Sequence, residues 1–406
     1  MNSKEIQKVP SVEKVADFSG RIVLVRVDFN VPIERGRVVE NYRLKAALPT
    51  IKYIIEHNGR VVLVSHLARP GGRYNKKYSL QPVYLELRKL LPKYKVKFWP
   101  EKIDKITKKD LTTIEVGEVI LLENLRFYPG EDKNQVNFAK KLASFADFYV
   151  NEAFSFSHRQ AASIDGVPNF IPSYVGFKFL EEISQLGKLI KPKRPAIGII
   201  GGLKIATKLP LMEKLLPSYN YFLVGGVAAN VFLAAQGYEI GKSLIDHGHI
   251  GDAKAMLKKF ANKIILPKDV MLGGEVNSIA VSRSITKDKD IVYKKDQMIL
   301  DIGPKTIRNF SKYIKQAKTI VWNGPMGKME DKRFSKGTFE LAKMVAKKSK
   351  GAAYGAVGGG ETIEALGRIK MLADMDFVST GGGAMLDFLI DHKKFPGLAA
   401  VLRKRK

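Results

Sequence analysis

The stretch RIVLVRVDF, residues 21–29, is an almost unbroken apolar run of the kind that forms a strand buried on both faces. Two similar runs follow, VVLVSH at 61–66 and EVILLE at 118–123. Residues 43–56 and 80–91, which lie between these runs, have the apolar spacing of helices. The alternation of buried strands with helices predicts a parallel sheet that is covered by helices on both faces.

The second half of the chain repeats a buried strand, a glycine turn and a helical pattern five times. In an open α/β sheet such turns line the carboxyl edge, where ligands bind. Glycine there lets a ligand approach the backbone N–H groups at a helix N-terminus. One such turn is equally consistent with tight packing, but five together predict a nucleotide or phosphate site. The turns are Gly201-Gly202, Gly225-Gly226, Asn323-Gly324-Pro325, Gly358-Gly359-Gly360 and Gly381-Gly382-Gly383.

A helical pattern without a glycine turn separates the two halves. It covers residues 175–190, VGFKFLEEISQLGKLI, and is ended by Pro192 and Pro195. We therefore expect an α/β chain of two doubly wound parallel-sheet domains, 1–174 and 193–385, joined by a helical hinge at 175–192. Residues 386–406 are expected to form a tail that packs back on the N-terminal domain.

The composition narrows the classes of function. The chain has 406 residues, with 69 Lys and Arg against 40 Asp and Glu, which gives a formal charge of +29 and favours anionic partners. It has no cysteine, which excludes disulfides, thiolate metal sites and cysteine nucleophiles. The first residues lack the apolar segment of a signal peptide, and no apolar run approaches the ~20 residues needed to span a bilayer. We therefore expect a cytoplasmic protein.

Polar and basic residues follow the strand-like runs of the first half. Asp28 and Asn30 alternate with apolar neighbours at the end of the first run, so both are expected to point the same way. The planar fork of arginine matches phosphate and carboxylate oxygens. A site for an anionic, hydroxyl-bearing ligand is therefore predicted, although a turn held by Asx hydrogen bonds and a solvated basic surface are the simpler alternatives. The basic candidates are Arg43, His66, Arg69, Arg126, His158 and Arg159.

Taken together, these segments resemble the phosphoglycerate kinase family. RVDFNVP (26–32), ENLRF (123–127) and STGGGA (379–384) match the motifs of that family directly. SHLARP (65–70) is similar to SHLGRP, and NEAFSFSHR (151–159) is similar to NDAFGTAHR. GGLKIATK (201–208), WNGPMGKME (322–330) and GGGET (358–362) are similar to GGAKVSDK, WNGPMGVFE and GGGDT. The resemblance runs from Arg26 to Ala384 in the order of the family.

The resemblance implies reversible transfer of a phosphoryl group between ATP and the carboxylate of 3-phosphoglycerate, with 1,3-bisphosphoglycerate and ADP as the other pair. It implies a Rossmann-like fold for both domains, ATP or ADP with Mg²⁺ as the nucleotide, and direct in-line transfer after domain closure. It suggests a monomer that binds neither nucleic acid nor membrane. The implied 3-phosphoglycerate site is Asp28, Asn30, Arg43, His66, Arg69, Arg126 and Arg159 in the N-terminal domain. The implied nucleotide site of the C-terminal domain is Lys204, Lys208, Glu330, Gly359, Gly360, Glu361 and Thr362, with Glu361 near Mg²⁺, directly or through water. Arg43, Lys208, Gly381, Gly382 and Gly383 are implied to act on the transferring phosphoryl group.

The chain departs from the motifs of the family at four places. Glu361 stands where the family has Asp, and Lys328 replaces an apolar residue. Ala68 replaces a glycine, which disfavours a positive φ there. Residues 154–157, FSFS, replace smaller residues before His158 and put the path of that loop in question.

Two other classes remain as alternatives. The charge of +29 is compatible with a nucleic-acid-binding protein, but no known nucleic-acid-binding signature occurs and the lysines are scattered. The doubly wound pattern alone is compatible with a nucleotide-dependent dehydrogenase, but no G-x-G-x-x-G follows a strand. GYEIGKS (237–243) is one residue short of a phosphate-binding P-loop.

Overall fold

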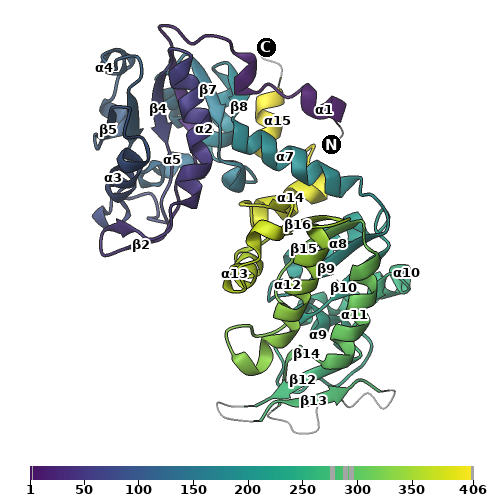
Figure 1. Ribbon diagram of the computed structural model, residues 1–406. Helices are drawn as coiled ribbons and strands as arrows, with labels where there is room; N and C mark the ends of the chain where they lie inside the picture. The colour runs from purple at the N-terminus through teal and green to yellow at the C-terminus, as the bar shows by residue number, and fades with distance from the viewer. Residues whose placement is uncertain (2, 275–278, 287–290, 292–296, 404–406) are drawn as a thin grey trace. The chain divides into compact units, whose positions relative to one another are not determined.

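The structure is a computed structural model that describes residues 1, 3–274, 279–286, 291 and 297–403. The chain divides into two compact units. Unit 1 comprises Met1–Ser184 and Asp391–Lys406, and unit 2 comprises Gln185–Ile390. The division falls inside helix α7 (Phe177–Ile190), which the sequence predicts almost to the residue. Figure 1 shows the elements of both units.

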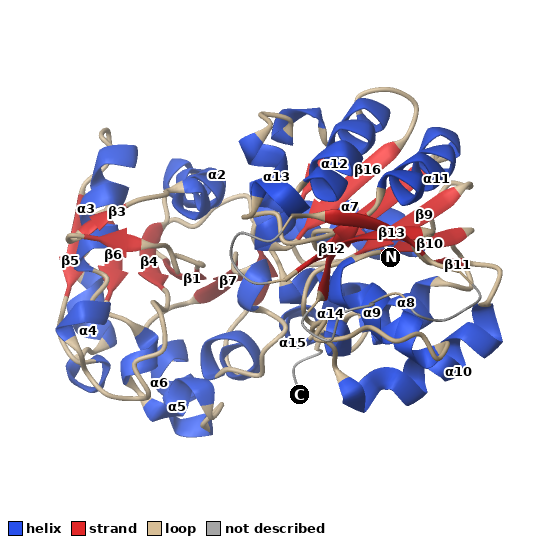
Figure 2. Ribbon diagram, turned by 90° about the horizontal axis from the view of Figure 1, so that it is seen from below, coloured by secondary structure: helices blue, strands red, loops and turns tan. Residues whose placement is uncertain are grey.

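Unit 1 is built on a six-stranded parallel sheet in the order β5-β6-β4-β1-β7-β8. All five residues of β1 are buried, because their side chains alternate between two faces of the sheet that are both covered. On one face Val23 and Val25 pack in a core with α2 and α3, and on the other Ile22 and Leu24 pack in a core with α4 and α6. Figure 2 shows helices on both sides of this sheet. The strands are β1 (Ile22–Arg26), β4 (Arg60–Val64), β5 (Val96–Trp99), β6 (Val119–Leu122), β7 (Phe148–Asn151) and β8 (Ser173–Val175).

The remaining elements of unit 1 cover this sheet or its edges. The helices are α1 (Ser3–Gln7), α2 (Tyr42–Glu56), α3 (Gln81–Leu90), α4 (Lys108–Thr112), α5 (Pro129–Asp132), α6 (Val136–Ala143) and α15 (Pro396–Leu402). A small hairpin joins β2 (Ile33–Glu34) to β3 (Arg37–Val38). The C-terminal helix α15 packs near β8 and the short helix Ala162–Gly166, and Phe395 just before it stacks on Phe154 with ring centroids 5.2 Å apart.

Unit 2 contains a second six-stranded parallel sheet, in the order β11-β10-β9-β15-β16-β17. Its strands are β9 (Ala196–Ile200), β10 (Tyr221–Val224), β11 (Ile264–Ile265), β15 (Thr319–Asn323), β16 (Tyr354–Gly358) and β17 (Phe377–Val378). The helices are α8 (Leu209–Leu215), α9 (Gly226–Ala235), α10 (Ile250–Phe260), α11 (Pro304–Gln316), α12 (Lys336–Ser349), α13 (Gly360–Arg368) and α14 (Gly383–Asp391). Figure 2 shows α11, α12 and α13 on one face and α8, α9 and α10 on the other, so both predicted sheets are doubly wound and parallel.

Unit 2 also has a smaller antiparallel sheet that the sequence did not lead us to predict. It has the order β13-β12-β14 and is formed by β12 (Asp269–Gly273), β13 (Val281–Ser284) and β14 (Met298–Ile302). Residues 275–278, 287–290 and 292–296, which fall between these strands in the sequence, are outside the described ranges.

In each sheet the strands follow one another outward in both directions from one neighbouring pair, except that β6 lies between β4 and β5. In unit 1 this reversal of strand order lies between β1 and β7, and in unit 2 it lies between β9 and β15. Ligands of open α/β sheets bind at the carboxyl ends of the strands beside such a reversal. The loops after these four strands are therefore the places where a site is expected.

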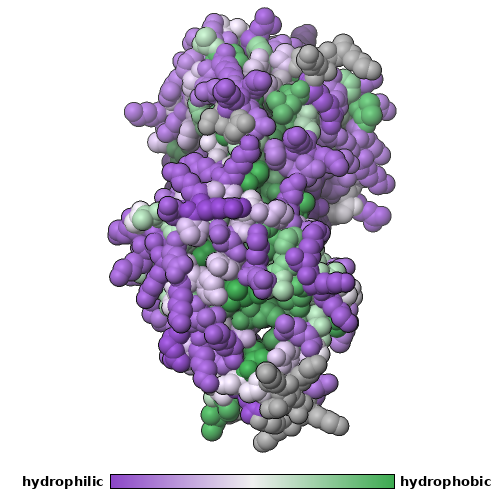
Figure 3. Space-filling model, turned by 90° about the vertical axis from the view of Figure 1, so that its right-hand side faces the viewer, coloured by the Kyte–Doolittle hydropathy of each residue, from purple (hydrophilic) through white to green (hydrophobic). Residues whose placement is uncertain are grey.

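The surface drawn in Figure 3 is largely hydrophilic, as expected for a chain in which 27% of the residues are charged. Hydrophilic side chains cover much of the face drawn in Figure 3, and apolar side chains gather mainly in its lower half. No helix in the described part of the chain has both the length and the apolar character needed to cross a membrane.

Candidate active site

The candidate residues of unit 1 lie at the carboxyl ends of four neighbouring strands. Strand β1 is shorter than the predicted run of 21–29, because the N–H of Phe29 bonds to the Ser65 hydroxyl at 2.9 Å and leaves the ladder. Asp28 and Asn30 therefore lie in a loop, and the expected strand alternation does not determine their directions. Asp28 and Asn30 follow β1, His66 and Arg69 follow β4, Arg126 follows β6, Arg159 follows β7, and Arg43 lies in the first turn of α2.

Asp28 connects its own loop to helix α2 and to the loop after β7. Its carboxylate accepts hydrogen bonds from the Arg43 guanidinium and the Ser155 hydroxyl, and its Oδ1 accepts one from the N–H of Asn30 at 3.1 Å. Burial opposes the ionised form, but the Arg43 guanidinium and the other bonds outweigh burial and lower the pKa of Asp28. Asp28 is thus an anchor that holds Arg43 at the site.

His66 is a neutral hydrogen-bond donor. Its side chain is only 3% exposed, and burial, followed by the charge of Arg26, lowers its pKa well below the usual value. The Arg26 Nη2 lies 3.1 Å from His66 Nδ1. Because a guanidinium can only donate, Nδ1 must accept and the ring proton must sit on Nε2. The imidazole therefore presents an Nε2–H to a ligand.

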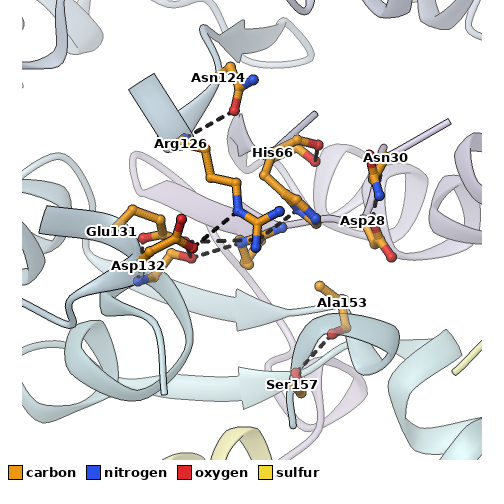
Figure 4. Close-up of polar contacts among 12 residues, drawn as sticks. Asp28, Asn30, His66, Asn124, Arg126, Glu131, Asp132, Ala153 and Ser157 are labelled. Atoms are coloured by element: carbon orange, nitrogen blue, oxygen red, sulfur yellow. Dashed lines mark hydrogen bonds and ion pairs between the residues drawn. The ribbon is translucent and has the colours of Figure 1, made fainter. Parts of the chain in front are cut away.

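Arg126 is fixed by the loop after β4. Its Nη1 donates to the carbonyl of Ala68 at 2.7 Å, and its Nε donates to Asp132 at 3.1 Å. The N–H of Ala68 in turn donates to the side chain of Asn30 at 2.9 Å. Ala68 has φ of 53°, so the chain keeps the left-handed turn that the replacement of glycine was expected to disfavour. Figure 4 shows the side chains of His66 and Arg126 converging above the sheet.

Behind this cluster lies a buried network that the sequence analysis missed. The fully buried Arg26 donates through Nε to the Ser163 hydroxyl at 2.8 Å, and its Nη2 lies 3.9 Å from Glu131. Burial raises the pKa of Glu131, although Arg26 and Ser163 oppose this effect. The nearest sequence signal was Arg26 itself, a cation inside an apolar run. Of the residues predicted for the site of unit 1, Asn30, Arg69 and Arg159 are exposed at the rim.

Two of the candidate residues of unit 2 border a cavity of about 390 Å³. The cavity lies at the carboxyl ends of β9 and β15, beside the reversal of strand order. Its wall is mainly apolar, and of the predicted residues it includes Glu330 and Glu361. Asp301, which was not predicted, also lines it, and burial raises the pKa of this carboxyl to about 7. The other lining residues include Gly202, Leu203, Gly226, Val227, Leu244, Pro325 and Met326.

The side chain of Lys208 reaches back to the first glycine turn, Gly201-Gly202. Its Nζ donates to the carbonyl of Gly201, and burial lowers its pKa to about 8. A Cβ on Gly202, which has φ of 73°, would lie 2.9 Å from Lys208 Nζ and 3.3 Å from Glu361 Oε2. The bare glycine therefore keeps open the space into which a cation and a carboxylate both point. Lys204, by contrast, is exposed.

The remaining candidates lie at the N-termini of two helices, α13 and α14. Gly359 has φ of 92° and precedes α13, which begins with Gly360 and Glu361. Thr362 is buried and accepts a hydrogen bond from the N–H of Gly324 at 2.7 Å, so it ties α13 to the loop after β15. Gly381, Gly382 and Gly383 form the turn into α14, with Gly382 at φ of 49°. Each of these turns directs backbone N–H groups toward the carboxyl edge of the sheet.

Comparison with known proteins identifies the family. A sequence profile described as phosphoglycerate kinase matches residues 12–392. The chain belongs to the phosphoglycerate kinase family. It is 41% identical to a phosphoglycerate kinase of Moorella thermoacetica, over 96% of this chain and 98% of the relative. It is 42% identical to one of Borrelia garinii over the same shares. A solved phosphoglycerate kinase structure from Coxiella burnetii matches with a TM-score of 0.86 and 37% identity, over 98% and 99% of the two chains. One from Pyrococcus horikoshii matches with 0.81 and 29%, over 97% and 98%.

Membership of this family makes the chain a kinase of glycolysis that transfers a phosphoryl group between 3-phosphoglycerate and ATP. It decides against both a dehydrogenase and a nucleic-acid-binding protein as the main function. It also confirms the predicted fold class, two parallel-sheet α/β domains.

Proposed function

We propose that the arginine cluster of unit 1 binds 3-phosphoglycerate and that the cavity of unit 2 binds ATP or ADP. The observation that carries the first assignment is that Arg43, His66 and Arg126 gather at the carboxyl end of the sheet, where Asp28 holds Arg43, Arg26 bonds to His66 and the Ala68 carbonyl holds Arg126. The ligand has a phosphate of about −1.5 to −2 charge and a carboxylate, which suits a largely cationic cluster. Asn30, Arg69 and Arg159 complete the proposed site at its rim.

The second assignment rests on the shape and chemistry of the cavity. An apolar slot with a few polar groups at one end suits an adenosine, and Glu330 on its wall can accept from ribose hydroxyls. Lys208 and the exposed Lys204 are proposed to meet the phosphates, and so are the backbone N–H groups that begin α13 at Gly359 and Gly360.

The residues present fit an Mg²⁺ ion carried by the nucleotide. Such an ion typically takes one or two carboxylates and obtains its other ligands from phosphates and water. Glu361 supplies one carboxylate that faces the same space as Lys208, at the phosphate end of the proposed site. Among the described residues no group of three or more His, Asp and Glu side chains could hold a metal without the nucleotide. When bound, the ion would neutralise charge on the phosphate oxygens.

The chemistry needs neutralisation of charge more than a strong base. The main barrier is the approach of two anions, and no proton has to leave the attacking carboxylate. Arg43, Lys208 and the N–H groups of Gly381–Gly383 are proposed to share the charge of the transferring phosphoryl group. Direct in-line transfer follows from this arrangement, because it requires no protein nucleophile.

We further propose that the two substrates start on different units and meet by hinge closure. In-line transfer requires reacting atoms roughly 3–3.5 Å apart, with water excluded. The proposed acceptor residues all precede residue 160, whereas the nucleotide residues follow residue 200. Helix α7, which contains the division between the units, and the turn at Gly381–Gly383 are the proposed moving parts. Small-angle scattering should show a smaller radius of gyration with both substrates than with either alone.

The test of the assignment is a coupled assay of ADP formation from ATP and 3-phosphoglycerate. Arg43→Ala should lower kcat at least tenfold, since Arg43 is proposed to act on the transferring group. Lys52→Ala is the matched control, because Lys52 is an exposed cation on the same helix. Equal kcat values in both variants and the parent chain would contradict the role of Arg43.

The chain is proposed to act as a cytoplasmic monomer on these small-molecule substrates. Light scattering coupled to size-exclusion chromatography would test the oligomeric state, and a mass near 45.3 kDa is expected.

A further inference from the structure

A single aromatic ring lies at the centre of the cationic cluster of unit 1. The ring is that of Phe156, which is 4% exposed. The guanidinium carbons of Arg26, Arg126 and Arg159 lie 4.6, 5.0 and 5.9 Å from its centroid. The imidazole of His66 lies against it in a tilted arrangement, with centroids 4.3 Å apart and 34° between the planes.

The ring offsets the electrostatic repulsion among these arginines. The three guanidinium groups around the ring carry like charges and repel one another. Of these three, Arg126 bonds to Asp132 and Arg26 lies beside Glu131, whereas Asp28 binds Arg43. An aromatic face attracts guanidinium groups without competing for the donors that a phosphate or carboxylate needs. Contacts of this kind are effective up to about 6 Å from the centroid, which includes all three arginines.

The ring is also a departure of this chain from its family. In the segment NEAFSFSHR, Phe156 stands where the similar motif NDAFGTAHR has threonine. A threonine has no π face and fills less space. The neighbouring Ser155 stands where that motif has glycine, and its hydroxyl bonds to Asp28. Both changes in this loop therefore add a contact to the same cluster.

We propose that Phe156 is a positioning residue that gathers Arg26, Arg126 and Arg159 around one ring, so that the guanidinium groups are arranged for the substrate before it binds. This inference rests on the proposed 3-phosphoglycerate site. Preorganisation lowers the cost of ordering these side chains upon binding. The effect should therefore appear in the affinity for 3-phosphoglycerate and not in that for the nucleotide, which is proposed to bind to unit 2.

The test is calorimetric titration of the full chain with 3-phosphoglycerate in the absence of nucleotide. Phe156→Leu keeps an apolar side chain of similar size but removes the π face, and should weaken the affinity on the order of tenfold. Phe156→Tyr retains the ring and should stay within about twofold of the parent chain. Phe156→Thr, the residue of the family motif, should bind no better than Phe156→Leu and provides a second variant without a ring. The KM for ATP should be unchanged in all three.

Two controls separate the possible outcomes. Phe18→Leu makes the same change at another buried ring of unit 1, near the amino end of β1, and should lower stability without changing the affinity. Arg126→Ala tests the proposed binding site itself. If Arg126→Ala weakens binding but Phe156→Leu and Phe156→Thr do not, the ring only fills space and the proposal is wrong. If Arg126→Ala has no effect either, the placement of 3-phosphoglycerate fails, and the role of Phe156 fails with it.

A readout that does not depend on substrate is available from NMR. The Nε–H protons of Arg26 and Arg126 should show ring-current shifts in the ligand-free chain. These shifts should disappear in Phe156→Leu and persist in Phe156→Tyr. Unchanged shifts in Phe156→Leu would show that the ring does not lie against the guanidinium groups, and would overturn the proposal.

Discussion

Replacing Ala68 by glycine should raise the free energy of unfolding of unit 1 by about 0.5–1 kcal/mol. Ala68 has φ of 53°, and the left-handed conformation costs an L-residue about 1–2 kcal/mol. Glycine removes that cost but gains about 0.5–1 kcal/mol of conformational freedom in the unfolded chain. The two terms leave a small net gain. Ala68→Val should have the opposite effect, since a β-branched side chain tolerates this conformation poorly.

The assay must report on unit 1 alone, because a chain of two units need not unfold in one step. The chain has two tryptophans, Trp99 in unit 1 and Trp322 in unit 2. In a Trp322→Phe background, guanidinium chloride unfolding followed by Trp99 fluorescence gives the midpoint for unit 1. Asn58→Gly is the matched control: Asn58 has φ of 64°, but asparagine adopts this conformation more readily, so its gain should be smaller.

The reasoning would be refuted if Ala68→Gly lowered the midpoint, or if Ala68→Val left it unchanged. A functional consequence accompanies the stability change. The backbone of Ala68 holds both Asn30 and Arg126, so a more flexible glycine should weaken the binding of 3-phosphoglycerate modestly while it stabilises the fold.

Three further predictions concern titratable groups. Burial lowers the pKa of Lys208 to about 8, so the affinity for ADP should fall between pH 7 and 9. Lys208→Arg stays charged and should flatten that pH profile. A profile of unchanged steepness would argue against a contact between Lys208 and phosphate. Burial raises the pKa of Glu152 from 4.5 to about 7, so folding takes up a proton and this group's contribution to stability decreases as the pH rises from about 4.5 to 7, by about 3 kcal/mol. Glu152→Gln should remove that slope from unfolding curves measured at pH 5 to 8, and an undiminished slope would mean that another group causes it. Glu361→Gln should weaken the Mg²⁺ dependence of turnover, and an identical Mg²⁺ titration would count against its proposed role.

Much of the fold could be predicted because its signals are local. The buried strands are short apolar runs, the turns after them contain glycine, and α7 ends before two prolines, so each element is visible within about ten residues of sequence. The antiparallel sheet of unit 2 was not predicted. Its three strands pair across Asp269–Ile302, and only that pairing, which the sequence does not display, distinguishes them from further strands of the parallel sheet.

The buried residues around the candidate site were harder to predict from the sequence than the residues at its rim. Arg26 and Ser163 are 137 residues apart in sequence, and Ser163 and Glu131 are 32 apart, so no spacing rule connects them. The aromatic centre of the cluster lies in the FSFS run at 154–157, which by itself indicates only that the path of this loop differs from that of the family. Its meaning depends on which arginines surround the ring, which is a property of the folded chain.

The position of α15 has a consequence for folding during synthesis on the ribosome. Unit 1 is not continuous: Phe395 stacks on Phe154, and the N–H of Gly397 bonds to the carbonyl of Ser157 at 2.9 Å. These last pieces are translated after the whole of Gln185–Ile390, roughly 200 residues later, which takes about 10–40 s at 5–20 residues per second. During that time the surface around Phe154 lacks its cover, whereas unit 2 is continuous and can fold as soon as it has emerged. The half of the protein that is made first is therefore expected to be the half that is finished last.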